Sequence, residues 1–240
     1  MKPPTPETLA AAGFWAALLD LLLVGLIVAI AVDRWAPWQD VPWKPLRLAD
    51  PIGWATGMKL ARAAEDPALC RAVLREGGVR FSEARETREG FCTTRNSLRL
   101  SGGATPLSPG GPVMTCQMTL AYVFWDRHAV QLAARQELGA EVARVEHLGT
   151  YACRNVYGRA QGRPSHHAFA NALDVAGFAL EDGRRVTVLG DFRREDARGR
   201  FLRRVRNEGC GLFRAVLSPD YNAAHRDHLH LDFGGYRACR

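Results

Sequence analysis

The pattern of hydrophobic and polar positions divides the chain into an apolar N-terminal run, a stretch rich in Trp and Pro, and a longer mixed region. Residues 14–32 are apolar except for Asp20. A helix of about 20 apolar residues spans the hydrocarbon core of a bilayer, and Asp20 lies near one end of the run, where water is within reach. We therefore predict a transmembrane anchor in residues 1–33.

A cleaved signal peptide is the alternative interpretation of this run. Residues 29–31, Ala-Ile-Ala, resemble a small-x-small cleavage site. The run is long for a signal peptide, and Lys2 is the one basic side chain before it. Arg34, Lys44 and Arg47 follow the run and by charge alone favour a cytoplasmic C-terminal part, but long domains translocate largely regardless of nearby charge.

Residues 34–62 predict an extended linker between the membrane and a globular domain. Tryptophans concentrate at its start, where they suit a membrane–water interface, and prolines recur through it. These residues are Trp35, Trp38, Trp43, Pro37, Pro42, Pro45 and Pro51. The globular domain is then expected over residues 63–240.

The mixed region predicts short strands and a few helices. Asp66-Pro67 is a helix N-cap followed by Pro at the first helical position, and the apolar positions of residues 115–138 recur with helical spacing. A basic amphipathic helix is expected over residues 195–207. Predicted strands cover residues 79–82, 97–100, 142–148, 172–178, 185–189, 213–217 and 228–233. Without regular βαβ alternation, this order indicates an α+β fold.

Net charge narrows the possible partners. The chain carries 32 basic and 25 acidic residues, a formal charge of +7. Such an excess suits an anionic partner such as a membrane surface or a polyanionic cell wall, or solubility alone. Because the basic residues are scattered and form no nucleic-acid motif, we expect no nucleic-acid partner.

The six cysteines indicate an oxidising compartment. They are Cys70, Cys92, Cys116, Cys153, Cys210 and Cys239. None forms a C-x-x-C pair, which disfavours thiolate metal clips, and an even number behind an apolar N-terminus is typical of disulfides in an exported protein. Six cysteines allow 15 connectivities; we expect neighbours along the chain to pair, as Cys70–Cys92, Cys116–Cys153 and Cys210–Cys239.

Two segments carry the candidate chemistry. The first is residues 165–174, Ser-His-His-Ala-Phe-Ala-Asn-Ala-Leu-Asp, and the second is residues 227–230, Asp-His-Leu-His. Zinc prefers imidazole nitrogen and carboxylate oxygen, and catalytic zinc sites use three protein ligands and a water. In a strand, His228 and His230 point to the same face, so one can bind metal while the other lies beside it.

The first segment resembles S-x-H-x-x-G-x-A-x-D, the signature of the zinc D-alanyl-D-alanine peptidases, and the H-x-H near the C-terminus completes the resemblance. From about Thr115 onward the chain also resembles the bacterial extensin-like C-terminal domain family. That likeness lies in residues 145–151 (Val-Glu-His-Leu-Gly-Thr-Tyr), 153–155 (Cys-Arg-Asn) and 217–222 (Leu-Ser-Pro-Asp-Tyr-Asn). The resemblance implies a hedgehog/DD-peptidase-like fold, with a small antiparallel sheet flanked by helices.

Carried over residue by residue, the resemblance implies a Zn²⁺ site formed by His167, Asp174 and His230. Asp227 then lies where these peptidases often keep a Glu general base. His228 is implied to lie beside the metal, where it stabilises the oxyanion or moves a proton, so that either Asp227 or His228 is the base. The implied activity is zinc-dependent hydrolysis of a peptide bond in a stem or cross-link of peptidoglycan, as a D,D-endopeptidase or D,D-carboxypeptidase.

For the substrate, the same resemblance implies contact with Ser165, and a carboxylate held by Arg154 or Arg159, since Arg binds carboxylates bidentately. The implied location is the inner membrane with the domain in the periplasm, or the free periplasm if the anchor is cleaved.

Two departures from the signature favour an alternative function. Ala170 stands where the signature has Gly, so a backbone that needs positive φ is strained there, and Asp227 is one methylene shorter than Glu. A non-catalytic zinc-containing domain that binds the cell wall or acts as a scaffold is therefore the second hypothesis.

Overall fold

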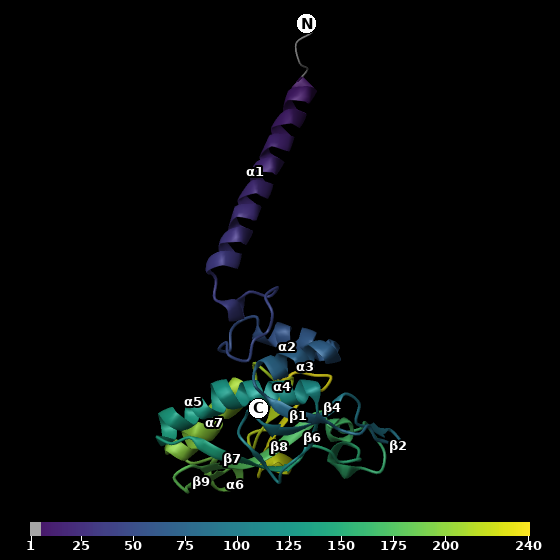
Figure 1. Cartoon of the computed structure of the whole chain (residues 1–240), viewed down its shortest axis with the longest axis vertical. Helices are drawn as coiled ribbons and strands as arrows, with labels where there is room; N and C mark the ends of the chain where they lie inside the picture. Colours follow the sequence, from purple (N-terminus) through teal and green to yellow (C-terminus); the bar gives the residue numbers. More distant parts are fainter. Residues whose placement is uncertain (1–5) are drawn as a thin grey trace.

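A long N-terminal helix stands away from a globular part in the computed structural model, which describes residues 6–240 (Figure 1). Helix α1 covers Pro6–Trp35, and its section Gly13–Trp35 is apolar and exposed along its length. The predicted apolar helix is confirmed. Its length and composition suit either a membrane span or a signal sequence.

The stretch after α1 is folded rather than extended. It contains a 3₁₀ turn, η1 (Trp38–Asp40), and helix α2 (Thr56–Glu65), followed by α3 (Pro67–Glu76). Leu60 of α2 is buried in the hydrophobic core. The expectation of an extended linker over residues 34–62 thus differs from the structure, because an amphipathic helix begins inside that range.

A seven-stranded sheet organises the globular part. Its order is β12-β10-β11-β8-β7-β5, with β9 also paired to β8. The neighbours β10–β11, β11–β8, β8–β7 and β8–β9 are antiparallel, whereas β5–β7 and β10–β12 are parallel. The strands are β5 (Leu107–Ser108), β7 (Val142–Gly149), β8 (Ala172–Leu180), β9 (Arg185–Thr187), β10 (Ala215–Leu217), β11 (Leu229–Asp232) and β12 (Ala238–Cys239).

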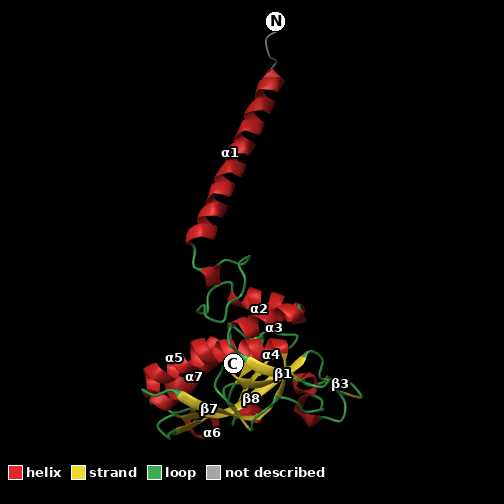
Figure 2. Ribbon diagram, viewed as in Figure 1, coloured by secondary structure: helices red, strands yellow, loops and turns green. Residues whose placement is uncertain are grey.

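Helices cover one side of this sheet (Figure 2). Helix α4 (Cys116–Trp125) continues through a π-helical turn (Asp126–Val130), α5 (Gln131–Ala133) and a second π-helical turn (Ala134–Leu138). This continuous helical segment lies near α7 (Ala197–Gly209). The Trp125 ring packs 6.1 Å from that of Phe178 on β8, and its Nε1–H donates to Val205 O at 2.8 Å. These buried aromatic contacts fix the helices on the sheet.

Smaller elements complete the mixed α+β domain that the pattern predicted. A three-stranded sheet has the order β1-β4-β6, and β2 pairs with β3. The bounds are β1 (Arg80–Glu83), β2 (Arg88–Glu89), β3 (Cys92–Thr93), β4 (Ser97–Gly102), β6 (Val113–Thr115) and α6 (Val188–Asp191). The predicted strand 185–189 ends early, because the Thr187 hydroxyl accepts from the Gly190 N–H at 3.2 Å and caps α6.

The six cysteines form three disulfides, and two of the three expected pairs are wrong. The observed pairs are Cys70–Cys116, Cys92–Cys153 and Cys210–Cys239. Only the last was predicted. The first joins α3 to the start of α4, and the second joins β3 to the chain after β7, so tertiary packing rather than sequence proximity decided the pairing. Disulfides together with the apolar helix point to an extracytoplasmic location.

Candidate metal centre

A short 3₁₀ helix presents His167. Helix η5 (His166–Phe169) begins after Ser165, whose hydroxyl accepts from the His167 N–H at 3.3 Å. The helix ends at Ala170, which has φ 51° and ψ 28°. The positive φ expected at this position of the signature is thus present, in a residue that carries a Cβ.

Two neighbouring strands, β8 and β11, supply the other two candidate metal ligands. In the antiparallel pair β8–β11, His230 lies directly opposite Asp174, so their side chains extend on the same face of the sheet. His230 Nδ1 lies 2.7 Å from Asp174 Oδ1. This cross-strand pair forms the floor of the site.

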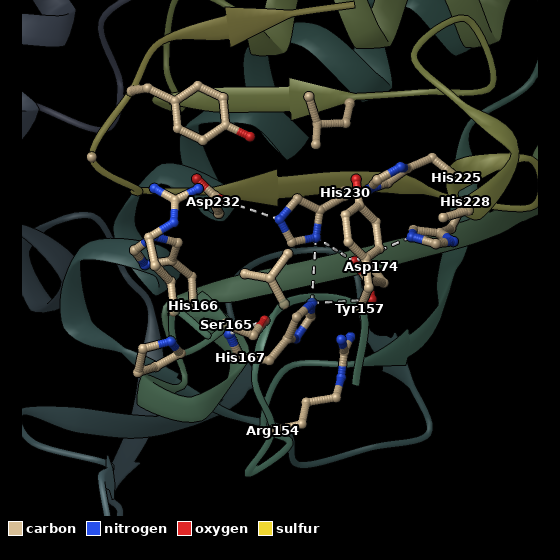
Figure 3. Close-up of a pocket in the computed structure, with 17 residues that line it drawn as sticks. Arg154, Tyr157, Ser165, His166, His167, Asp174, His225, His228, His230 and Asp232 are labelled. Carbon is tan, nitrogen blue, oxygen red and sulfur yellow. Dashed lines mark hydrogen bonds and ion pairs between the residues drawn. The ribbon is translucent and has the colours of Figure 1, made fainter. Parts of the chain in front are cut away.

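His167, on η5, completes the group of three candidate ligands (Figure 3). Its Nε2 lies 3.1 Å from Asp174 Oδ2 and 3.3 Å from His230 Nδ1, and one ligand atom of each residue lies within 4.8 Å of the others. Zinc bonds of about 2.0–2.2 Å in a tetrahedron place two ligands roughly 3.4 Å apart. The donor types and the 3.1 and 3.3 Å separations are therefore consistent with a bound metal ion, and these three residues could hold one.

Asp232 orients the ring of His230, a role that the sequence interpretation missed. Its Oδ2 lies 2.8 Å from His230 Nε2, and its Oδ1 accepts from the Gly234 N–H at 2.7 Å. With the Nε2 proton held by Asp232, the Nδ1 lone pair is directed at the metal position, an arrangement common at zinc sites. The alternation His-x-Asp in a strand was the available signal, because residues two apart share a face.

The electrostatics of this group show a buried network of charges. Burial by itself raises the pKa of the Asp174 carboxyl, but hydrogen bonds to His167 and His230 outweigh it and hold that pKa well below its usual range. Burial lowers the pKa of His230, yet its bonds to Asp174 and Asp232 raise it to about 9. A cation is thus favoured at this point of the molecule, whether a proton or a metal ion.

Two further histidines lie beside the metal group. His228 Nε2 lies 3.6 Å from Asp174 Oδ1, and its Nδ1 lies 2.9 Å from Asp227 Oδ1. His225, which the sequence did not single out, is buried, and its ring centroid lies 5.2 Å from that of His228. Burial and then the neighbouring His230 and His228 lower the pKa of His225 to about 4, so its ring is neutral at pH 7.

Asp227, which was predicted to act as a base at the metal, contacts the ring of His228. Its carboxylate bonds to the far nitrogen of the His228 ring, and the side chain is about two-fifths exposed, at 41%. Asp227 therefore orients His228 and reaches the site through that ring.

A cavity of about 700 Å³ opens over the group. Its lining includes Ser165 and Arg154, both predicted to face substrate, and also Arg163, which was not predicted. Arg159, the other candidate for a substrate carboxylate, instead lies with its guanidinium carbon 5.8 Å from the ring centroid of Tyr157.

A hairpin-like loop forms one wall of the cavity. Asn155 pairs with Pro164 across it, and Cys153 at its base is joined to Cys92. Within it, the Tyr157 hydroxyl accepts from Asn222 Nδ2 at 3.0 Å. The loop is thus bonded to the segment just before Ala224 and His225, which line another wall of the cavity.

Comparison with known proteins identifies the family of this domain. Residues 68–240 match the family described as "Extensin-like protein C-terminus". No curated protein and no solved structure matches the chain. The matched range includes every residue of the metal group and of the cavity wall, and it covers more than half of the 240 residues. The chain therefore belongs to the extensin-like C-terminal domain family.

Proposed function

We propose that the domain is a zinc-dependent peptidase of the cell envelope that hydrolyses a peptide bond in a stem or cross-link of peptidoglycan. The observation that carries the proposal is the convergence of His167, Asp174 and His230 at the floor of an open cavity. Three protein ligands with one side open to a cavity are typical of catalytic rather than structural zinc. The likeness to the S-x-H-x-x-G-x-A-x-D signature adds support, and with it a hedgehog/DD-peptidase-like fold.

Zinc bound by these ligands would lower the pKa of a coordinated water to about 7 and so supply a nucleophile at neutral pH. The protein's own groups then move the proton. His228, with Nδ1 held by Asp227, presents Nε2 on the side of Asp174. In the proposal it takes the proton and delivers it to the leaving amine, as a general base and then acid.

His225 has a different proposed role. Its Nδ1 lies 2.8 Å from Asn222 Oδ1, which fixes the orientation of the ring. Because it is neutral at pH 7, it adds no positive charge to the site, and a neutral imidazole aimed into the cavity is suited to hydrogen bonding with substrate.

Substrate is proposed to lie between the loop and the opposite wall. Arg154 and Arg163 line the cavity and supply guanidinium groups for a carboxylate of the peptide, while Ser165 contacts the chain near the scissile bond. Stem peptides of peptidoglycan carry carboxylates, and the net charge of +7 suits an anionic polymer.

One observation favours a second function, a zinc-containing domain that binds the wall without cleaving it. Asp227, the predicted base, bonds to Nδ1 of the His228 ring. If His228 alone cannot act as the general base, the domain would not cleave peptide bonds, and the bound metal would serve only to stabilise the fold.

The test combines metal analysis with digestion. Full-length protein in detergent, its Asp174→Asn variant and the control Asp182→Asn, an exposed turn residue, are assayed for zinc and for cleavage of purified muropeptides. We expect about one zinc per chain and new amino termini with the native protein and the control, and neither with Asp174→Asn. Zinc without cleavage would favour the wall-binding function, and no zinc in the native protein would reject both.

A further inference from the structure

The end of α1 is packed against the segment that follows it. Trp43 Nε1–H donates to Asp33 Oδ1 at 2.9 Å, Lys44 Nζ donates to Asp33 O, and Trp43 lies beside Ala29 and Ile30. The last turns of the apolar helix therefore form part of a folded unit.

That unit continues into the globular domain. Lys59 Nζ of α2 donates to Trp38 O at 2.6 Å, and the Trp54 N–H donates to Asp40 Oδ1 at 2.7 Å. Trp38 Nε1–H in turn donates to Pro45 O at 2.8 Å. These bonds join η1, which begins just after α1, to the start of α2, so the domain is held close to the end of the apolar helix (Figure 1).

Three tryptophans of this unit are exposed to solvent. Trp35 is 80% exposed, Trp54 76% and Trp43 54%. Large exposed apolar side chains on one folded unit mark an interaction surface. An indole, with an apolar body and one N–H donor, suits the membrane–water interface. We call Trp35, Trp43 and Trp54 the tryptophan collar.

Basic side chains accompany the collar. Arg34, Arg47 and Arg62 are exposed, and the Arg47 guanidinium lies 3.5 Å from the Trp38 ring centroid. Basic side chains near an anionic membrane surface are attracted to its phosphate groups. The collar and these arginines thus supply aromatic and basic side chains, the two kinds of side chain that phospholipid headgroups bind.

The length of the apolar helix places Trp35 and Trp43 at the depth of the headgroups. The 23 residues Gly13–Trp35 extend about 34 Å at 1.5 Å per residue, slightly more than a hydrocarbon core of about 30 Å. Trp35 then lies in the headgroup layer, and Trp43, which is bonded to the last turns of α1, lies beside it.

We infer that α1 is retained as an anchor and that the tryptophan collar docks the domain on the phospholipid headgroup surface, with the domain held against the membrane rather than on a flexible tether. The cleavage-like residues 29–31 are helical and lie beside Trp43, whereas a protease requires an extended segment. The inference does not depend on the proposed peptidase activity.

Two measurements on the full chain test it. The intact mass of protein purified from membranes is expected to include residues 1–31, and a chain that begins after Ala31 would overturn the inference. In nanodiscs of mixed zwitterionic and anionic phospholipid, Trp54 emission is obtained by subtracting the Trp54→Phe variant from the native protein.

Lipids brominated near the headgroup end of the acyl chain are expected to remove most of this Trp54 emission. The matched control is the same subtraction in nanodiscs without bromine. Equal Trp54 emission with and without bromine would show that the collar faces water and would refute docking. The variant's far-UV circular dichroism confirms that it is folded.

Discussion

His230 Nε2 lies 2.8 Å from Oδ2 of Asp232, two residues further along the same strand. The strand geometry places both side chains on one face, and the Gly234 N–H holds the other oxygen of Asp232. The ring of His230 is thereby fixed between Asp232 and Asp174, with Nδ1 on the side of His167 (Figure 3).

Replacing Asp232 tests the importance of this bond. Asp232→Asn is expected to weaken zinc binding about 10- to 100-fold, because outer-shell partners of metal-bound histidines have effects of that size. Competition with a chromogenic chelator gives the affinity. Asp182→Asn, in an exposed turn, serves as the control, and an unchanged zinc affinity for Asp232→Asn would show that His230 needs no such support.

Zinc binding is expected to depend on pH through His230. Its pKa in the metal-free protein is raised from 6.5 to about 9. Below pH 9 a proton therefore occupies the ring nitrogen that would bind zinc, and zinc must displace it. Affinity should rise by up to about tenfold per pH unit up to pH 9. Calorimetry in buffers of different ionisation enthalpy should detect proton release at pH 7.5, and a binding heat independent of the buffer would contradict this.

The raised pKa of His230 also predicts how the stability of the zinc-free protein depends on pH. A raised folded-state pKa stabilises the fold most when the group is protonated, so this contribution is fully present below pH 6.5 and is lost as pH rises through about 9. Thermal unfolding after chelation should show a falling melting temperature over that window. A melting temperature that rises with pH there would be inconsistent with the His230 network.

Ala170 allows a test of backbone strain. Its φ of 51° lies in the left-handed region, which β-branched residues tolerate poorly. Ala170→Val is expected to destabilise the domain by about 2–3 kcal/mol, combining backbone strain with overpacking of a buried site. Ala170→Gly should change stability by less than about 1 kcal/mol, since relief of strain offsets the lost methyl burial. Urea unfolding of the two variants distinguishes these outcomes; equal destabilisation would argue against strain.

The proposed proton transfer gives His228 a role different from that of the three candidate metal ligands. His228→Ala is expected to reduce peptide cleavage about 10²- to 10⁴-fold, the usual contribution of a general base, while zinc content stays at the native level. Asp227→Asn should have a smaller effect in the same direction, because it acts through His228. A larger loss for Asp227→Asn than for His228→Ala would assign the base to Asp227 instead.

Local patterns predicted much of the candidate site. The spacing within residues 165–174 and 227–230 indicated which side chains could bind metal, and strand periodicity correctly predicted that His230 and Asp174 belong to strands. The positive φ at Ala170 was also expected. Such features depend on residues close in sequence, whose relative directions are fixed by the 2.0- and 3.6-residue periods of strands and helices.

The residue pattern was enough to predict the apolar N-terminal helix, the α+β character and the three candidate ligands. Contacts in the tertiary structure were needed to show that Cys70 pairs with Cys116, that residues 34–62 fold against the domain, that Asp227 bonds to His228, and that Asp232 orients His230. The physical reason is that periodicity reports which face of an element is buried, whereas a pairing between distant segments depends on how those faces pack together, and many packings are compatible with the same pattern.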